Sequence, residues 1–300
     1  MGGCARLKSA LLIPHTGKEV PYLIHPVEPK KVLCIHDLSG MGRCSLAVIL
    51  PVLSVMGVQP VALPTVVLST HTGGLGTPAR LDGCAYGEQA LEHYHALGVE
   101  FDCIYTGYLG GEDQVALAEK AFALWPAAKK IVDPVMGDNG EVYSSYTPEM
   151  CTRMRELCAI ADLITPNTTE AAILLGRDPA SAPQSEREAE EWMRALYEEY
   201  GASVVLTGLD YEPGRVGSGC LENGELTISL HERIDCYYPG TGDVFAAVML
   251  GALLGGAKLR DACVKAGEFV RDTIAYTAEQ HTDPNFGVQF EKLLPQLWNK

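Results

Sequence analysis

Short apolar runs alternate with longer segments of helical periodicity along most of this chain, beginning at Lys31. Apolar runs of roughly 4–8 residues bounded by turn residues are typical of buried strands, and apolar residues repeated every three or four positions are typical of amphipathic helices. We predict strands at residues 32–36, within 60–68, and at 103–107, 130–134, 163–166 and 203–208. We predict helices at residues 44–57, 83–97, 112–124, 148–161, 168–175, 185–200, 241–254 and 259–279.

This alternation predicts an α/β fold in which a mainly parallel central sheet is flanked by helices on both faces. Two further apolar-alternating segments flank Asn223-Gly224, a pair typical of tight hairpin turns. No Pro/Ser-rich linker, repeat or low-complexity segment divides the chain, so we expect a single domain over residues 31–300 with no large separate lid domain. We interpret residues 1–30 as an extension outside the core fold, from a vector or an early start codon.

The charge balance restricts the partners. The chain has 23 Lys and Arg against 38 Asp and Glu, which gives a net charge of −15. A broad nucleic-acid or anionic-membrane surface is not expected, because both need basic patches. Ten scattered cysteines with no CxxC pair indicate reduced thiols in a cytoplasmic protein. No apolar run approaches the length of a membrane span.

The strongest candidate for chemistry lies in the last fifth of the chain. Gly240, Thr241, Gly242 and Asp243 directly precede residues 244–254, an apolar run typical of a buried helix. A helix start of this kind presents unpaired N–H donors and attracts an anion. Donors that hold a phosphate beside a carboxylate that accepts a proton suit phosphoryl transfer. The alternative is that the glycines end a loop and Asp243 caps a core helix.

Polar groups follow the predicted strands, and parallel sheets bind ligands beyond the carboxyl ends of their strands. Asp37 follows the first strand, and His71 and Thr72 follow the second within a glycine-rich segment. Tyr108 follows the third strand, where its ring could cover a flat substrate. The alternatives are an ordinary loop around Asp37, a solvated loop at His71 and Thr72, and core filling by Tyr108.

The fourth strand is followed by Asp133, Asp138 and Tyr143. Pro134 restricts the preceding residue to an extended backbone, so Asp133 is held rigidly at the strand end. Two carboxylates near a nucleotide most simply serve Mg²⁺ and its bound waters. The competing interpretation is a turn in which Asp and Gly serve the backbone alone.

The fifth strand is followed by Asn167 and Glu170, whose spacing is that of a helix N-cap and its reciprocal partner. A capping box explains both residues without any function. It is compatible with a second role, in which the Glu170 carboxylate holds a metal through water near the anion site. After the sixth strand, Thr207 could touch a nucleotide.

Together these segments resemble the ribokinase-like superfamily and, within it, the pyridoxal (vitamin B6) kinases, from about Lys31 to near the C-terminus. The motifs that carry the resemblance are GTGD (240–243), DPVMGD (133–138), ADLITPNTTE (161–170), STHTG (69–73) and TGY (106–108). The first places the chain in the superfamily, and the last two point to the B6 kinases.

The resemblance implies a ribokinase-like fold and ATP-dependent phosphorylation of the hydroxymethyl group of pyridoxal, pyridoxamine or pyridoxine. It also implies Mg²⁺, a monovalent cation (K⁺ or Na⁺), and a homodimer acting in vitamin B6 salvage. Asp243 would be the catalytic base, and the backbone at Gly240, Thr241 and Gly242 the anion hole. The other implied roles are ATP binding by Asp133, Thr165, Asn167, Glu170 and Thr207, metal binding by Asp138, Tyr143 and Glu170, and substrate binding by Asp37, His71, Thr72 and Tyr108.

Two positions depart from the B6 kinase pattern. Those kinases commonly have serine where this chain has Asp37, and an aromatic residue often stands where this chain has Leu68. The HDLSGMG segment (36–42) is similar to hydroxymethylpyrimidine kinases of thiamine synthesis, which are therefore the nearest alternative. A catalytically silent nucleotide-binding regulator and an NAD-binding oxidoreductase are the remaining alternatives; the dinucleotide glycine spacing fails because Ser45 occupies its third position.

Overall fold

A computed structural model describes residues 28–298 of the chain. The predicted extension, residues 1–30, lies almost wholly outside the described residues. The described strands are β1 Lys31–Met41, β2 Gln59–Thr70, β3 Arg80–Asp82, β4 Cys103–Thr106, β5 Lys129–Val132, β6 Gly137–Asp138, β7 Glu141–Val142, β8 Leu163–Ile164, β9 Ser203–Leu209, β10 Arg215–Glu222 and β11 Glu225–Glu232.

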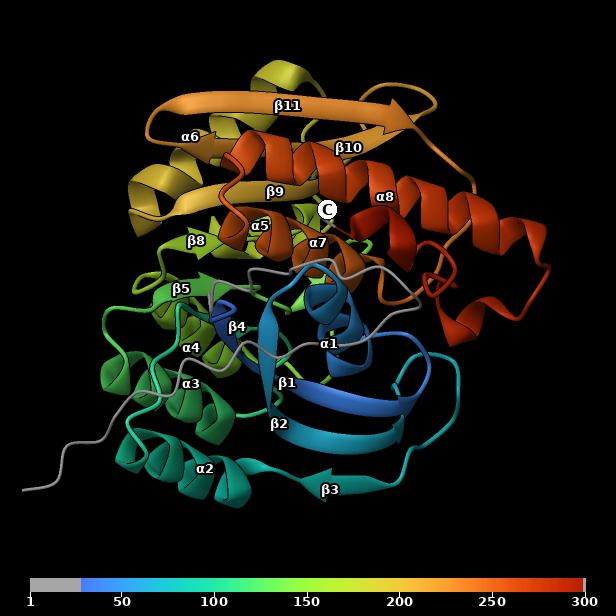
Figure 1. Ribbon diagram of the computed structural model, residues 1–300. Coiled ribbons are helices and arrows are strands. Elements are labelled where there is room, and N and C mark those ends of the chain that lie inside the picture. Colours follow the sequence, from blue (N-terminus) through green and yellow to red (C-terminus); the bar gives the residue numbers. More distant parts are fainter. Residues whose placement is uncertain (1–27, 299–300) are drawn as a thin grey trace, which may run out of the picture.

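Nine of these strands form one central sheet in the order β11-β10-β9-β8-β5-β4-β1-β2-β3 (Figure 1). The six strands from β9 to β2 in this order pair in parallel. The strands β3, β10 and β11 pair antiparallel with their neighbours at the two edges. The short strands β6 and β7 form a separate hairpin.

Helices cover both faces of the sheet. Alternate residues of a strand point to opposite faces, so Leu33 and Ile35 join one apolar cluster while Val32 and Cys34 join the other. Helices α2 to α6 pack over the first cluster, and α1, α7 and α8 pack over the second (Figure 1). The helix bounds are α1 Leu46–Val55, α2 Cys84–Ala96, α3 Glu112–Leu124, α4 Pro148–Cys158, α5 Thr168–Leu174, α6 Glu186–Tyr200, α7 Thr241–Leu254 and α8 Leu259–Glu279.

The winding direction of the sheet reverses at β1. From β1 the chain passes to β2 on one side, and β4, β5, β8 and β9 follow on the other side. In such sheets ligands bind beyond the carboxyl ends of the strands, at the point of reversal. The carboxyl end of β1 and the segments beside it are therefore where a site is expected.

The predicted fold class is confirmed, and α3, α7 and α8 have the predicted bounds. The hairpin also forms, with positive φ angles of 52° and 83° at Asn223 and Gly224. The main differences are short elements that carry no periodicity: β3, the β6–β7 hairpin, and the 3₁₀ helices η1 Pro284–Phe286 and η2 Leu294–Leu297. The first strand runs on to Met41, beyond the predicted residue 36, because the added residues pair with β2 as far as Thr70.

Two properties expected from composition can be compared with the described residues. None of the described helices combines the length and the apolar character needed to span a membrane. Between residues 28 and 298 the cysteines form no disulfide, and most of them are buried. Both observations agree with the sequence analysis.

Candidate active site

Two glycines shape the N-terminus of α7 in different ways. Gly240 is the N-cap residue with φ 81°, and a Cβ at this position would lie 1.9 Å from the carbonyl oxygen of Arg43. Only glycine therefore fits this turn. A Cβ at Gly242 would meet nothing within 4 Å, and Gly242 is exposed. The first turn of α7 thus has open space beside Gly242, and the unpaired N–H groups of a helix N-terminus are a usual place for an anion to bind.

Asp243 lies in that first turn, and both of its carboxylate oxygens are contacted, one from β1 and one from the loop that follows it. Its Oδ2 accepts the backbone N–H of Ser45 at 2.8 Å, and its Oδ1 lies 3.2 Å from Nε2 of His36. The Asp243 side chain keeps 15% exposure. Ser45 has φ 56°, a strained backbone for a non-glycine residue, and this geometry points its N–H at the carboxylate.

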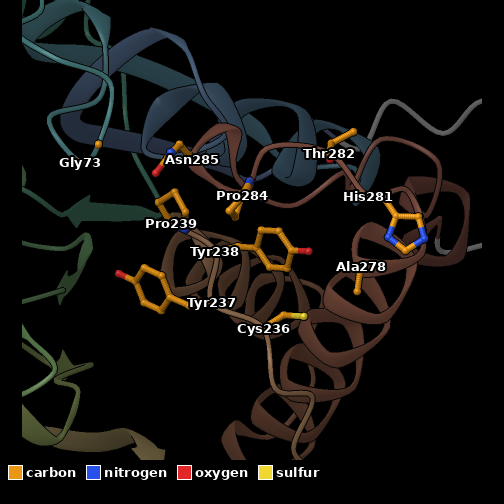
Figure 2. A pocket seen from close by; sticks show the side chains of 11 residues that line it. Gly73, Cys236, Tyr237, Tyr238, Pro239, Ala278, His281, Thr282, Pro284 and Asn285 are labelled. Carbon is orange, nitrogen blue, oxygen red and sulfur yellow. The ribbon is translucent and has the colours of Figure 1, made fainter.

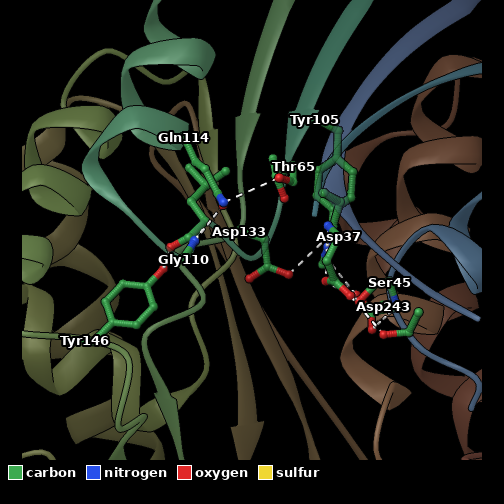
Figure 3. A network of polar contacts seen from close by, with 12 residues as sticks. Asp37, Ser45, Thr65, Tyr105, Gly110, Gln114, Asp133, Tyr146 and Asp243 are labelled. Carbon is green, nitrogen blue, oxygen red and sulfur yellow. Dashed lines mark hydrogen bonds and ion pairs between the residues drawn. The ribbon is translucent and has the colours of Figure 1, made fainter. Parts of the chain in front are cut away.

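Behind Asp243 lies a buried pair, His36 and Asp37 (Figure 3 shows Asp37, Ser45 and Asp243). Nδ1 of His36 is 2.9 Å from Oδ1 of Asp37, which also accepts the Ser45 hydroxyl at 2.6 Å. The other oxygen of Asp37 accepts the Ser39 hydroxyl at 3.1 Å. Burial opposes a charge on His36, but its contacts with Asp243 and Asp37 prevail and raise its pKa to about 10.

Both carboxylate oxygens of Asp37 are therefore occupied by contacts with residues of this chain. Burial alone would raise the pKa of its carboxyl, but His36 and the two serine hydroxyls lower it below the usual value. Asp37 is therefore a carboxylate that faces a histidine, with donors at both oxygens. The predicted contact with substrate remains a prediction.

Asp133 follows β5 and is partly buried next to the Tyr105 ring, whose hydroxyl donates to Asp133 Oδ2 at 3.3 Å (Figure 3). Burial and the nearby negative charge of Asp243 raise the pKa of Asp133 to about 7. Thr165, at the end of β8, is also buried, and its Oγ1 has no hydrogen-bond partner among the described residues. A partly buried carboxylate and a buried hydroxyl side by side on neighbouring strand ends mark a place where a polar ligand or a cation fits.

The predicted capping box is present at α5. Asn167 accepts the Glu170 N–H at 2.9 Å, and Glu170 Oε2 accepts the Asn167 N–H at 2.8 Å. Oε1 of Glu170 accepts the backbone N–H of Met136 at 3.2 Å, so both oxygens are engaged. Burial and nearby Asp133 raise the pKa of Glu170 well above its usual value. Thr207 lies beside this segment, because Asn167 and Thr207 form an isolated parallel bridge.

Asp138 and Tyr143 lie on and next to the small β6–β7 hairpin. Asp138 also meets a segment far away in sequence, because the hydroxyl of Tyr237 donates to its Oδ2 at 3.2 Å. Burial and the neighbouring charges of Asp138 and Glu170 raise the pKa of the Tyr143 hydroxyl. The three residues predicted to hold a metal therefore lie close enough to interact electrostatically.

His71 connects the loop after β2 to the C-terminal segment. Its Nε2 donates to the carbonyl oxygen of Asn285 at 2.5 Å, and its Nδ1 accepts the Gly73 N–H at 3.1 Å. Its ring also packs against Gly42, where a Cβ would lie 2.4 Å from His71 Cδ2. His71 is thus buried with both ring nitrogens engaged, whereas Thr72 beside it is exposed.

Tyr108 stands on the segment after β4, partly buried against Tyr146 with ring centroids 6.2 Å apart. Its hydroxyl donates to Ser145 Oγ at 3.0 Å. Tyr146 in turn donates to the Leu109 carbonyl oxygen at 2.7 Å. These contacts hold the Tyr108 ring from one side and leave it partly exposed.

A cavity of about 790 Å³ opens beside the α7 N-terminus, between the loop after β2, the β11–α7 connection and the end of α8 (Figure 2). Its walls include Tyr237, Tyr238 and Pro239, which directly precede the Gly240 N-cap. Asp243 does not line this cavity. We take the polar cluster around Asp243 as the candidate active site. The cavity lies next to it, at the N-terminus of α7.

The structure brings the predicted residues together as two neighbouring groups. Asp37 and Asp243 belong to one group, and Asp133, Thr165, Asn167 and Glu170 belong to the other, with Asp133 near enough to Asp243 for their charges to interact. Sequence reasoning assigned no role to Ser45, Tyr105, Tyr237 or Asn285, and placed His36 only at a strand end. The sequence did hold a signal for His36, since two adjacent polar residues, His and Asp, are unusual at the end of an apolar strand. The other four residues reach the site only because the fold brings distant segments together, so no local pattern marks them.

Comparisons with known proteins agree with this geometry. The profile of the phosphomethylpyrimidine kinase family matches residues 50–286. A pyridoxine/pyridoxal/pyridoxamine kinase of Bordetella avium is 29% identical over 261 residues, which cover 82% of this chain and 85% of that protein. A pyridoxine kinase of Bacillus subtilis is 32% identical over 192 residues, covering 62% of this chain and 69% of that one.

Solved structures give the same result. The pyridoxal kinase of Lactobacillus plantarum has a TM-score of 0.83 and 33% identity, covering 90% of this chain and 97% of that one. A provisionally named phosphomethylpyrimidine kinase of Bacteroides thetaiotaomicron, in a crystal form with pyridoxal, has a TM-score of 0.84 and 36% identity, covering 90% of this chain and 96% of that one.

The relatives and solved structures identify the class of the protein: it is a kinase, a phosphotransferase with an alcohol group as acceptor, and a helix N-terminus with a carboxylate in its first turn is compatible with that chemistry. The match to the family profile, over more than half of the chain, identifies the particular group. The chain belongs to the phosphomethylpyrimidine kinase family, within the ribokinase-like fold that it shares with the pyridoxal kinases. The resemblance stated from the sequence motifs is confirmed.

Proposed function

We propose that this protein uses ATP to phosphorylate the hydroxymethyl group of a B6 vitamer: pyridoxal, pyridoxamine or pyridoxine. The observation that carries the proposal is the α7 N-terminus, where exposed Gly242 stands one residue before Asp243, a carboxylate fixed at both oxygens. Curated relatives with B6 kinase names and the Bacteroides structure with pyridoxal support the choice of substrate.

The backbone N–H groups at Gly240, Thr241 and Gly242 form the anion hole for the phosphate that is transferred. Asp243 takes the proton of the substrate hydroxyl as the oxygen bonds to phosphorus. Little covalent chemistry is required of the protein, so catalysis comes mainly from positioning and charge stabilisation. A general base of this kind contributes about 10²–10⁴-fold.

The neighbouring group of residues binds the nucleotide and its metal. Asp133, Thr165, Asn167 and Thr207 border ATP. Asp138, Tyr143 and Glu170 hold Mg²⁺, Glu170 through water because both of its oxygens already accept backbone N–H groups. The partly buried Asp133 carboxylate and the buried Thr165 hydroxyl fit a hard cation and its water shell. When bound, Mg²⁺ supplies positive charge to the phosphate oxygens.

The substrate ring lies near Tyr108 and Thr72, with His71 holding the loop that carries Thr72 against Asn285. Asp37 lies on the same side, behind Asp243. On the resemblance we include a monovalent cation, K⁺ or Na⁺, a homodimer and a role in vitamin B6 salvage. The scattered cysteines support a cytoplasmic location.

A pyrimidine alcohol is the second candidate substrate. It is favoured by the family profile, whose description is phosphomethylpyrimidine kinase, and by Asp37 in place of serine. The chemistry at Asp243 is the same for both, so only the ring contacts distinguish them.

The test is a kinase assay with ATP and Mg²⁺ across the three vitamers and hydroxymethylpyrimidine, in which both ADP and the phosphorylated alcohol are measured. We expect at least one vitamer to be phosphorylated with kcat/KM at least about tenfold above the pyrimidine, the discrimination that roughly 1.4 kcal/mol provides. A preference for the pyrimidine would reassign the substrate. Release of ADP with none of the four alcohols would contradict the proposal.

A further inference from the structure

His36 stands between two carboxylates in a way that fixes its charge. Nδ1 is 2.9 Å from Asp37 Oδ1, and Nε2 is 3.2 Å from Asp243 Oδ1. A bare ring nitrogen would place its lone pair against an anionic oxygen, which is repulsive. Two anionic oxygens this close favour a proton on each nitrogen, which makes His36 an imidazolium. The Asp37 backbone N–H also points at Nδ1 from 2.9 Å, so it competes with Asp37 Oδ1 for this nitrogen, and the charged oxygen prevails over the neutral N–H.

The two contacts of His36 are unequal. Asp37 is the buried partner, and both of its oxygens already accept hydrogen bonds from the hydroxyls of Ser39 and Ser45. On the other side, the approach of Nε2 to Asp243 is within ion-pair range but is not aligned as a hydrogen bond, and Nε2 has no hydrogen-bond partner among the described residues. A buried N–H donor thus remains available next to the candidate base. Such contacts often tighten only when substrate is bound.

The surroundings of His36 add negative charge and no positive charge. The titratable groups around it are Asp37, Asp243, Asp133 and the Tyr105 hydroxyl, whose ring centroid is 6.4 Å from that of His36. Asp37 and Asp243 each form an ion pair with His36. His36 is therefore a cation in direct contact with this acidic cluster, at the place where an anionic phosphate must approach.

The ring of His36 is also fixed sterically. A Cβ at Gly107 would lie 1.9 Å from His36 Cδ2 and 2.0 Å from Nε2. The glycine of the TGY segment therefore makes room for the imidazolium, which could not otherwise reach Asp243.

We propose that His36, held by Asp37, is a positively charged positioning residue for Asp243 in the phosphoryl transfer. The Ser45 N–H fixes one oxygen of Asp243 by a hydrogen bond and the charge of His36 attracts the other from 3.2 Å, so the carboxylate faces the substrate hydroxyl in one orientation. Asp37 then acts on the reaction through His36 and not by contact with the substrate. This inference rests on the proposed function for the reaction that it serves.

The first test reads the charge of His36 directly and needs no substrate. Long-range ¹H–¹⁵N spectra of the eight histidines are recorded at pH 8, and His36 is assigned by its loss in His36→Gln. We expect both ring nitrogens of His36 to be protonated at pH 8, and its titration midpoint to fall by at least about one pH unit in Asp37→Asn, because an opposite charge within ~4–6 Å favours the charged form. A neutral His36 at pH 8 in the wild-type protein overturns the proposal.

The second test separates positioning from substrate binding. We expect kcat to fall about 10- to 100-fold in His36→Gln and Asp37→Asn, the range that a small misplacement of a catalytic group produces, with both KM values within about threefold. His36→Asn, which cannot reach Asp243, should be at least as slow as His36→Gln. The double variant should be no more than about threefold slower than His36→Gln, because the two residues act as one unit. His93→Gln, the same change on the exposed side of α2, is the control that should leave every reading unchanged.

Three outcomes overturn the proposal: a higher vitamer KM with unchanged kcat in Asp37→Asn, losses that multiply in the double variant, or normal kcat in both His36 variants. If the wild-type protein phosphorylates none of the four alcohols, the proposed function fails, and the charge of His36 is still decided by the spectra.

Discussion

The two glycines at the start of α7 should respond oppositely to the same substitution. Gly240→Ala places a Cβ 1.9 Å from the Arg43 carbonyl oxygen at a φ of 81°. Gly242→Ala adds a methyl group with no neighbour within 4 Å, inside a helix. The first change must shift α7 or the loop that carries Arg43, whereas the second is compatible with the fold.

The magnitudes follow from these surroundings. A left-handed backbone costs a non-glycine residue about 1–2 kcal/mol, and the overlap with Arg43 adds to that. We therefore expect Gly240→Ala to lower the free energy of unfolding by at least about 2 kcal/mol. Alanine is favoured over glycine in a helix by about 0.5–1 kcal/mol, so Gly242→Ala should leave the free energy of unfolding unchanged or raise it by up to that amount.

Gly242→Ala, the variant expected to keep its stability, should still lose turnover. In Gly242→Ala the methyl group projects into the open space where the phosphate is proposed to bind, so turnover should fall at least about tenfold, as expected when a contact worth more than ~1.4 kcal/mol in the transition state is lost. Equilibrium urea unfolding gives the stability, and ADP release with the preferred vitamer gives the turnover. A stable Gly242→Ala variant with turnover within threefold of the wild type would refute the anion-hole assignment.

Three further expectations concern single side chains. Asn167→Ala removes the cap of α5, so it should lower the free energy of unfolding by about 1 kcal/mol and raise the KM for ATP. Thr147→Ala removes the cap of α4 and should lower the free energy of unfolding by a similar amount while leaving the KM for ATP unchanged. Equal KM values in the two variants would remove Asn167 from the nucleotide site. Because the pKa of His36 is raised from 6.5 to about 10 in the folded protein, its contribution to stability is complete below pH 6.5 and is lost as pH rises to about 10. Urea unfolding of His36→Gln should lack this decline in the free energy of unfolding. The same decline in the variant and the wild type would contradict the charged state of His36. Tyr108→Phe keeps the ring and loses only the hydrogen bond to Ser145, so the vitamer KM should stay within threefold of the wild-type value. Tyr108→Ala removes the ring and should raise that KM about tenfold. Equal effects of the two changes would place the ring outside the substrate site.

The layered fold could be predicted because its signals are local. Each buried strand is a short apolar run, α3 and α8 show helical periodicity over several turns, and α7 is an apolar run too long for a strand, so their bounds follow from the chain itself. Elements such as β3 and the β6–β7 hairpin have two or three residues and form only because a neighbouring segment offers hydrogen bonds. No pattern of their own marks them.

The site was predictable to the extent that its residues follow strands or begin helices. Asp243, Asp133 and Glu170 could be placed at one sheet edge by that rule alone. The contact of His36 with Asp243 could not, because it joins β1 to the first turn of α7, and the two residues are 207 positions apart in the sequence (243 − 36). The same holds for Tyr237 and Asp138, which meet only when the β11–α7 connection folds over the β6–β7 hairpin.

The central claim is that Asp243 accepts the proton of the substrate alcohol during phosphoryl transfer. Asp243→Asn tests it most directly, since the amide oxygen can still accept the Ser45 N–H while the base is lost. With the preferred vitamer, ATP and Mg²⁺, we predict that kcat falls about 10²–10⁴-fold while the KM values change by less than about threefold. A folded Asp243→Asn protein that turns over at a near-normal rate would contradict the claim.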